Sequence, residues 1–225
     1  SASDLTDVRF MRTFDPDQDI NRGTFSTYND VVQNPDTLHH LAIVSATGPY
    51  SGVDVALVGL DDTWRGSVFG FTNTDPYDFY AYDNPIDPNG SLADVAISLT
   101  DAIGTIAAGD HVQVTYLTTT NVATDGSNAL YGTAGNDTID GLGGDDLLIG
   151  LDGADTFVFA PGSGHDTILD FTPGTDKIAL NGFAGIPLGG NGSFSEANLD
   201  TWKATPGVFE TVGSDVLIHL SADDS

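Results

Sequence analysis

The sequence predicts an all-β protein with two parts, an antiparallel β-sandwich or jelly roll over residues 1–121 and a parallel β-roll over residues 122–225. In the first part, short apolar or alternating runs are separated by Gly, Pro, Asn and Asp clusters, which is typical of a sandwich. No stretch keeps a helical period for more than two turns. In the second part a nine-residue repeat is typical of a parallel roll.

The first part contains six runs that we expect to form strands, and residues 30–40, which precede them, could form a short helix or a loop. Turn-forming residues dominate the gaps, as in residues 83–90. The boundary is placed near residue 122, where Gly becomes dense after a run of threonines. The six runs are Leu41–Ser45, Val53–Leu60, Trp64–Thr72, Tyr77–Tyr82, Asp94–Leu99 and His111–Leu117.

The second part begins with four consecutive nine-residue units in one register. In every unit the fourth residue is Gly, the sixth is Asn or Asp, and the eighth is large and apolar. The units are Ala123–Tyr131, Gly132–Asp140, Gly141–Ile149 and Gly150–Val158. We expect each eighth residue (Leu130, Ile139, Leu148, Phe157) to face inward and stack on its counterpart two repeats later.

The repeated residue types indicate a site for a hard cation. Gly lets the backbone turn sharply and leaves carbonyl oxygens pointing inward, and the sixth residue adds a carboxylate. Ca²⁺ takes six to eight oxygens at roughly 2.3–2.6 Å. Turns two repeats apart should share an ion, so we expect Asp137 to pair with Asp155, and Asn128 with Asp146. The candidate ligands are Asn128, Gly132, Ala134, Asp137, Gly141, Gly143, Gly144, Asp146, Gly150, Asp152, Gly153 and Asp155.

This pattern resembles the RTX nonapeptide, Gly-Gly-x-Gly-x-Asp-x-U-x. The following segment, Gly162–Leu180, is similar to the cap of serralysin-type C-terminal domains and of the carrier modules of secreted alginate epimerases. The resemblance covers about residues 123–220. It implies several Ca²⁺ ions, about two to five by the repeat geometry, and a capping β-sandwich that starts at the Asp-Lys-Ile-x-Leu strand. It adds three candidate ligands, Asp166, Asp170 and Asp176, of which Asp166 falls two residues late for the register.

The resemblance also implies export by a type I secretion system and folding outside the cell, where Ca²⁺ is abundant. The chain has no cysteine, and its start lacks the pattern of a signal peptide of the Sec type, which fits that route. Because the chain ends shortly after Ser214–Leu220, we expect the export signal itself to lie outside it.

Charge excludes several partners. Six Lys and Arg against 33 Asp and Glu give a formal net charge of −27, so neither a nucleic acid nor an anionic lipid surface is an expected partner. Multivalent cations are the natural counter-charge. No run of 18 apolar residues exists, so we expect no membrane span.

A second acidic cluster lies near the N-terminus. Asp15, Asp17 and Asp19 space their carboxylates at every second position, like the start of an EF-hand loop. That pattern lacks its Gly at Ile20 and its Glu at Ser26. We favour a solvated acidic turn and keep the three aspartates as secondary metal ligands.

Aromatic residues gather at residues 64–83, where Tyr80, Tyr82 and Asp78 share one face of a strand. Such a surface could stack on a sugar; core packing is the interpretation we favour. Enzyme templates are missing: there is no His-Glu-x-x-His, no Gly-x-Ser-x-Gly and no cysteine, so no catalytic residue is predicted. Adjacent His39 and His40 should point to opposite faces, which favours a surface pair over a shared site.

The leading hypothesis is a secreted, non-enzymatic calcium-binding protein: an adhesin, matrix component or binder of extracellular polysaccharide or cell-surface glycan. Its sandwich would supply recognition, and its roll would supply export and calcium-triggered folding. One alternative is the C-terminal non-catalytic fragment of a larger secreted protease, lipase or epimerase. Another is a surface-layer or appendage subunit locked by calcium, and a third is a small hydrolase with unrecognised carboxylate chemistry.

Overall fold

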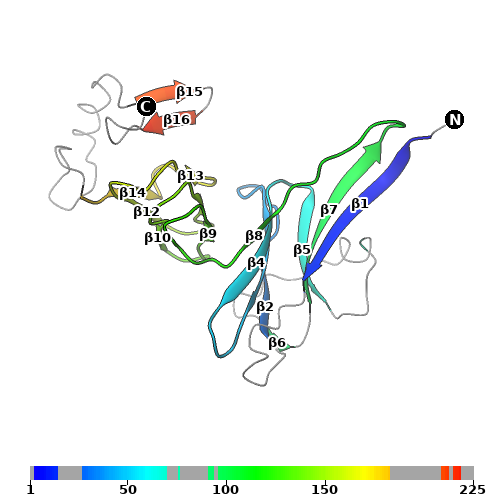
Figure 1. The fold of residues 1–225 in the computed structure, drawn as a ribbon, viewed down its shortest axis with the longest axis horizontal. Helices are drawn as coiled ribbons and strands as arrows, with labels where there is room; N and C mark the ends of the chain where they lie inside the picture. The colour runs from blue at the N-terminus through cyan, green and yellow to red at the C-terminus, as the bar shows by residue number, and fades with distance from the viewer. Residues whose placement is uncertain are drawn as a thin grey trace. The chain divides into compact units, whose positions relative to one another are not determined.

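Strands dominate the computed structural model, which describes residues 3–14, 27–69, 76, 91–93, 96–182, 209–212 and 215–218 (Figure 1). The predicted fold class is confirmed: the N-terminal sheets are antiparallel, and the sheets of the repeat region are parallel. The chain divides into two units, Ser1–Val122 and Ala123–Ser225. No helix among the described residues is long and apolar enough to cross a membrane.

The first unit consists of two antiparallel sheets. One has three strands in the order β1-β7-β5, and the other has five in the order β6-β2-β3-β4-β8. The strands are β1 (Leu5–Phe14), β2 (Thr27–Gln33), β3 (Ala42–Thr47), β4 (Asp54–Gly59), β5 (Trp64–Phe69), β6 (Ser91–Ala93), β7 (Ala96–Ile106) and β8 (Leu117–Thr119).

The core of this unit combines apolar side chains from both sheets. Leu57 and Val44 come from the five-stranded sheet, and Trp64 and Leu99 come from the three-stranded one. All four are almost fully buried. The Trp64 ring meets the Phe10 ring edge-on, with centroids 6.2 Å apart at 84°. Two sheets that pack their apolar faces against each other in this way form a β-sandwich.

Four of the six predicted runs coincide with strands β3, β4, β5 and β7, whereas the run Tyr77–Tyr82 lies outside the described residues. The prediction for His111–Leu117 is wrong, because only its last residue belongs to a strand. Its alternation reflects packing of Val114 and Tyr116 on the core, without a continuous backbone ladder. Strands β1, β2 and β6 were not predicted, and residues 30–33, expected as helix or loop, belong to β2.

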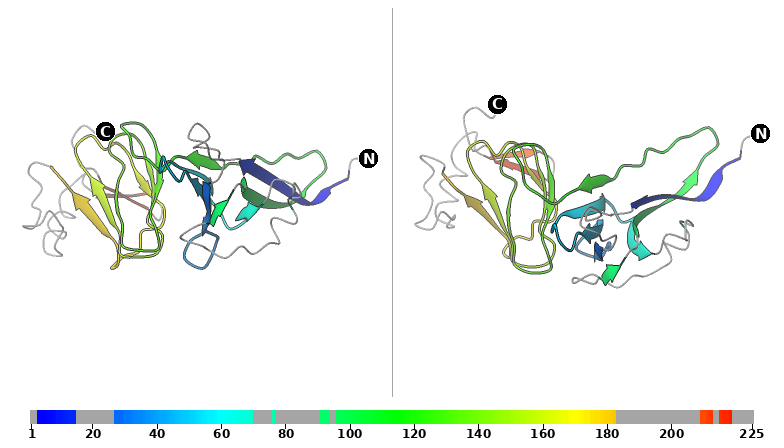
Figure 2. Two further views of the ribbon diagram at one scale, coloured as in Figure 1. Left: turned by 90° about the horizontal axis from the view of Figure 1, so that it is seen from below. Right: turned by 60° about the horizontal axis from the view of Figure 1, so that its bottom comes forward.

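The second unit begins with a parallel roll of two sheets, in the orders β13-β11-β9 and β10-β12-β14. Figure 2 shows its coils stacked on one another. Leu148 pairs with Leu130, and Phe157 with Ile139, so each coil takes two nonapeptides. The strands are β9 (Ala129–Tyr131), β10 (Thr138–Asp140), β11 (Leu147–Ile149), β12 (Thr156–Phe159), β13 (Thr167–Ile168) and β14 (Lys177–Leu180).

The eighth residues of the repeats form the core of the roll, as the sequence predicts. Leu148 and Phe157 are fully buried, and Leu130 and Ile139 are nearly so. The Phe171 ring packs on Phe157 with centroids 6.1 Å apart. The roll therefore has one narrow apolar interior with turns on either side.

One expectation about the cap needs correction. The strand Lys177–Leu180 does not begin a separate sandwich: it pairs in parallel with β12 and continues the roll. Leu180 is buried, and Ile178 pairs with the fully buried Phe157. Beyond it, the structure describes one antiparallel pair, β15 (Phe209–Val212) with β16 (Asp215–Ile218).

Candidate metal centre

The sixth residues of the repeats form two rows, one on each side of the roll, each directly before a strand. Residues 18 apart fall in one row because two nonapeptides complete a coil. We call them the Asp146 edge and the Asp155 edge. The Asp146 edge contains Asn128, Asp146 and Asp166, and the Asp155 edge contains Asp137, Asp155 and Asp176.

Each row is held together by hydrogen bonds from backbone to carboxylate. On the Asp146 edge, the N–H of Asn128 donates to Oδ1 of Asp146 (2.8 Å), and the N–H of Asp146 donates to Oδ1 of Asp166 (3.0 Å). On the Asp155 edge the corresponding distances are 2.9 Å from Asp137 to Asp155 and 3.0 Å from Asp155 to Asp176. Every carboxylate after the first residue of its row therefore binds the preceding coil through one oxygen.

The last member of each row comes from outside the regular repeat. Asp166 follows Asp146 by 20 residues and Asp176 follows Asp155 by 21. The extra residues lie in Gly-containing turns, so the carboxylates still reach the next position in the row. The sequence predicts the late position of Asp166, but the repeat alone does not identify Asp176 as the end of the other row.

A second set of contacts was missed by the sequence reasoning. The fifth residue of a repeat accepts a hydrogen bond from the coil that follows: the N–H of Ala154 donates to Oδ1 of Asn136 (2.9 Å), and the N–H of His165 donates to Oδ1 of Asp145 (3.0 Å). The usable signal was the Asn-Asp and Asp-Asp pairs at positions five and six. Position six therefore accepts a hydrogen bond from the preceding coil, and position five accepts one from the following coil.

Two carboxylates of the rows have an oxygen without a hydrogen-bond partner. Asp146 is 3 % exposed and Asp155 is fully buried, and Oδ2 of each is buried and unpaired. Buried polar atoms nearly always have a partner, and an unpaired buried charge is strongly unfavourable. A cation beside these oxygens would supply the missing partner, so both residues fit a calcium ion.

Glycines leave room beside these oxygens. A Cβ added to Gly141 would collide with Oδ2 of Asp146, and one added to Gly150 would collide with Oδ2 of Asp155. Gly153 adopts a φ of +134°, and a Cβ there would collide with the carbonyl oxygen of Gly135 in the preceding coil. Backbone carbonyls and carboxylates therefore approach one another closely, which is the oxygen-rich setting that Ca²⁺ requires.

Electrostatics also favours a cation here. Burial raises the pKa of Asp155 and outweighs the hydrogen bond from the Asp137 N–H, and the neighbouring carboxylates raise it further. Burial likewise raises the pKa of Asp166 to about 6, with the charges of Asp146 and Asp145 adding to the effect. In the metal-free roll, the surroundings of these carboxylates therefore raise their pKa and oppose ionisation. A bound divalent ion would lower the pKa and favour the ionised form.

The other predicted ligands have different surroundings. Asp170 accepts hydrogen bonds from the N–H groups of Gly150 and Leu151, 2.8 Å each, through its two oxygens. Asp152 and Ala134 are exposed, whereas Gly143 lies in the third turn, half-buried near the Gly162 carbonyl. Gly132 is half-buried beside Oδ2 of Asp137, and Gly144 packs on Gly126 of the preceding coil. The secondary candidates Asp15, Asp17 and Asp19 lie outside the described residues.

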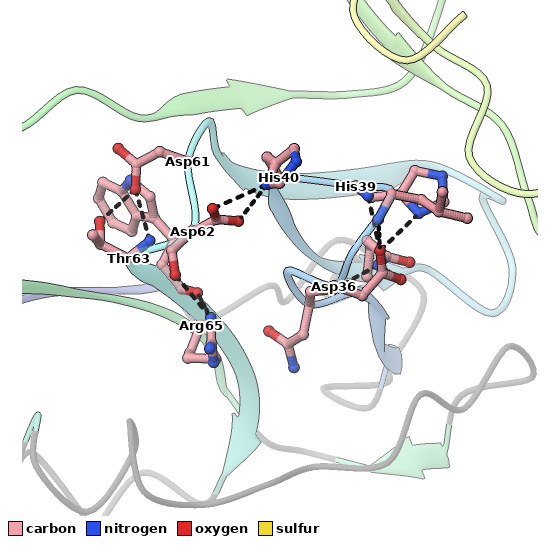
Figure 3. A network of polar contacts seen from close by, with 11 residues as sticks. Asp36, His39, His40, Asp61, Asp62, Thr63 and Arg65 are labelled. Atoms are coloured by element: carbon pink, nitrogen blue, oxygen red, sulfur yellow. Dashed lines mark hydrogen bonds and ion pairs between the residues drawn. The ribbon is translucent and has the colours of Figure 1, made fainter. Parts of the chain in front are cut away.

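Two histidines of the first unit, His39 and His40, take part in local polar contacts (Figure 3). His39 is buried with Nδ1 3.5 Å from Oδ1 of Asp36, whereas His40 is exposed with Nδ1 2.9 Å from Asp62. Burial raises the pKa of Asp36, but hydrogen bonds from the His39 and Leu38 N–H groups and from the side chains of Gln33 and His39 outweigh it and lower the pKa to about 2. Within the described part of the chain, no three His, Cys, Asp or Glu side chains gather to hold a metal.

The stacked parallel coils, the glycine turns and the carboxylate rows define a calcium-binding β-roll. The family model of the RTX calcium-binding nonapeptide repeat matches residues 122–157 with four copies. Residues 122–157 are therefore RTX calcium-binding nonapeptide repeats, and such repeats bind Ca²⁺ ions. No curated protein matches the chain.

Proposed function

We propose that this is a secreted, non-enzymatic protein whose C-terminal half folds when it binds Ca²⁺ outside the cell. The observation that carries the proposal is the buried, unpaired Oδ2 of Asp146 and of Asp155. With metal, these oxygens gain a partner and the binding free energy becomes folding free energy. Without metal, the crowded carboxylates oppose closure of the coils, and the Gly-rich chain loses much entropy on ordering.

The proposed ion ligands are the predicted set: the carboxylates of the two edges with the carbonyls of their Gly turns. Close packing of Gly153 on the Gly135 carbonyl supports this set, because it brings backbone oxygens from two coils together. The net charge of −27 supports a need for divalent counter-ions.

Export by type I secretion machinery is part of the proposal. RTX repeat proteins generally follow that route, and a chain without cysteines needs no disulfides to fold outside the cell. For the sandwich we propose an adhesive or matrix role with an extracellular polysaccharide or cell-surface glycan as ligand. A glycan array with and without calcium tests this ligand class, and calcium-dependent oligomers in light scattering would favour the surface-layer alternative.

The folding proposal is tested by circular dichroism of the full chain in calcium and in excess EGTA. We expect the strand signal of the roll to be lost in EGTA and to return when calcium is restored. Hydrogen exchange locates the change: residues 123–180 should lose protection, whereas the core strands of the sandwich should keep it. An unchanged spectrum in EGTA would contradict the proposal.

A further inference from the structure

The first two turns of the roll are closed by threonine. In the first unit the N–H and the hydroxyl of Thr124 donate to Oδ1 of Asn128, at 2.7 and 3.0 Å. The N–H of Gly126 donates to the Thr124 hydroxyl at 3.2 Å. The amide oxygen of Asn128 is therefore satisfied inside its own turn.

The second unit repeats this arrangement with a carboxylate. The N–H and the hydroxyl of Thr133 donate to Oδ2 of Asp137, at 2.6 and 2.9 Å, and the N–H of Gly135 donates to the Thr133 hydroxyl at 3.1 Å. The same three contacts hold a neutral Asn128 in one turn and an Asp137 in the next. Because the same hydrogen bonds form with a neutral amide, this turn needs no cation to stay closed.

The third and fourth units differ at the same second position. Leu142 and Leu151 stand there, with left-handed φ values of 69° and 68°. Their N–H groups donate away from the carboxylate of their own turn, to Asp140 (3.0 Å) and to Asp170 (2.8 Å). With neither a hydroxyl nor an inward N–H available, Oδ2 of Asp146 and Oδ2 of Asp155 stay buried and unpaired.

The far end of the Asp155 edge is closed like its beginning. The N–H of Thr172 donates to Oδ2 of Asp176 at 2.8 Å, again from four residues earlier. On this edge, therefore, Oδ2 of Asp137 and Oδ2 of Asp176 have partners within their own turns, whereas Oδ2 of Asp155 has none.

We infer that calcium on this roll is bound principally at the two middle turns, one on each edge, through Oδ2 of Asp146 and Oδ2 of Asp155. Thr124 and Thr133 close the first two turns without metal and act as an N-terminal cap. This inference rests on the proposed function and narrows its ligand set. A cap is physically required, because the first coil of a solenoid has no earlier coil to satisfy its polar groups.

The threonines also set the order of binding. An ion can reach Oδ2 of Asp137 only after two hydrogen bonds of Thr133 are broken. At the usual strength of such bonds, this weakens binding by roughly 30-fold relative to an open turn. The second residue of the nonapeptide is therefore the residue that decides whether a turn binds calcium tightly.

The test counts calcium ions on the full chain by isothermal titration and native mass spectrometry after chelation. Asp155→Asn and Asp146→Asn should each lower the number of tightly bound ions by one. The deciding variant is Asp137→Asn, which reproduces the natural Asn128 in an equivalent turn and should lose none. The matched control is Asp145→Asn, which keeps an oxygen for the His165 N–H and reproduces the natural Asn136 at the fifth position. Because only differences from the wild-type chain are compared, ions bound elsewhere do not affect the result.

A gain-of-binding variant guards against variants that fail to fold. Thr133→Gly removes the hydroxyl and permits the left-handed conformation, so it should add one tightly bound ion at Asp137. Thr124→Gly beside the neutral Asn128 should add none. Loss of an ion in Asp137→Asn, or no added ion in Thr133→Gly, would overturn the inference while leaving calcium-driven folding intact. A wild-type chain that folds fully in EGTA would instead overturn the proposed function.

Discussion

Glycines of the same conformation have unequal roles in the turn before β13. Gly162 and Gly164 have φ values of +92° and +94°, so replacing either by Ala imposes the same left-handed strain. A Cβ on Gly162 meets nothing, whereas one on Gly164 collides with the carbonyl of Gly144 in the preceding coil. The contact between coils, rather than the backbone angle alone, makes Gly164 indispensable.

We expect Gly162→Ala to lower the free energy of unfolding by about 1 kcal/mol, the cost of a left-handed Ala. Gly164→Ala should lower it by about 3 kcal/mol or more, because the coils must also move apart. Urea unfolding in saturating calcium, followed by circular dichroism, measures both. Equal losses for the two variants would show that this close approach is absent in solution.

Protons and calcium should compete for the Asp146 edge. The pKa of Asp166 is raised to about 6 from 3.8, so the folded metal-free roll holds a proton that the unfolded chain releases between these values. This group therefore stabilises the metal-free fold most below pH 3.8 and ceases to do so as the pH rises through 6. The metal-free roll is therefore least unstable in acid, where this carboxyl group is neutral.

We accordingly expect acid to replace calcium in part: in EGTA, the strand signal of the roll should be larger at pH 4 than at pH 8. Circular dichroism of the full chain in EGTA at the two pH values measures the difference. Asp155 should contribute in the same direction, since its pKa is also raised by burial. Asp166→Asn should reduce the gain in strand signal on acidification, and an unchanged gain would contradict the assignment.

At the scale of single residues, the sequence identifies the sixth position but not its environment. A period of nine places Asp137 and Asp155 in equivalent positions, and both were predicted as ligands. Their surroundings differ because one turn has Thr133 and the other Leu151 at the second position. That difference depends on contacts between residues four apart in a folded turn. The nine-residue period alone does not predict these contacts.

The elements of the roll depend on their eighth residues, and this can be tested within one repeat. Leu148 is fully buried between coils, whereas Leu142 in the same unit is 48 % exposed. Leu148→Ala should lower the free energy of unfolding by about 2–5 kcal/mol in calcium, since it leaves a cavity in a narrow interior. Leu142→Ala should change it by less than about 0.5 kcal/mol. Thermal unfolding at saturating calcium distinguishes them, and comparable losses would argue against the stacked core.

Strands were predicted correctly where the residue pattern had a single structural cause. The inward-facing eighth residues follow from the repeat alone, and β3 and β4 are continuous apolar runs. The prediction failed at His111–Leu117, where alternating residues pack on the core without forming a full strand. It also failed at Lys177–Leu180, because the resemblance gave this strand to a cap, whereas its register with β12 makes it a rung of the roll.

At the scale of the whole molecule, the question is whether calcium acts by general charge screening or at defined positions. A formal charge of −27 repels itself, and 1 M salt reduces the Debye length to about 3 Å, so screening alone would let NaCl fold the roll. Mobile ions cannot screen an oxygen that is shut off from solvent, and Asp155 is fully buried. Na⁺ also lacks the charge to offset the cost of burying that carboxylate.

We therefore expect 1 M NaCl in EGTA to leave residues 123–180 unprotected in hydrogen exchange, and millimolar Ca²⁺ at low salt to protect them. Mg²⁺ should act poorly, because it requires a tighter octahedral shell than a turn of carbonyls offers. The sandwich supplies the internal control: its core around Trp64 is formed by apolar side chains and should be equally protected in all conditions. Full protection of the roll by NaCl would mean that repulsion, and not a set of bound ions, is what calcium relieves.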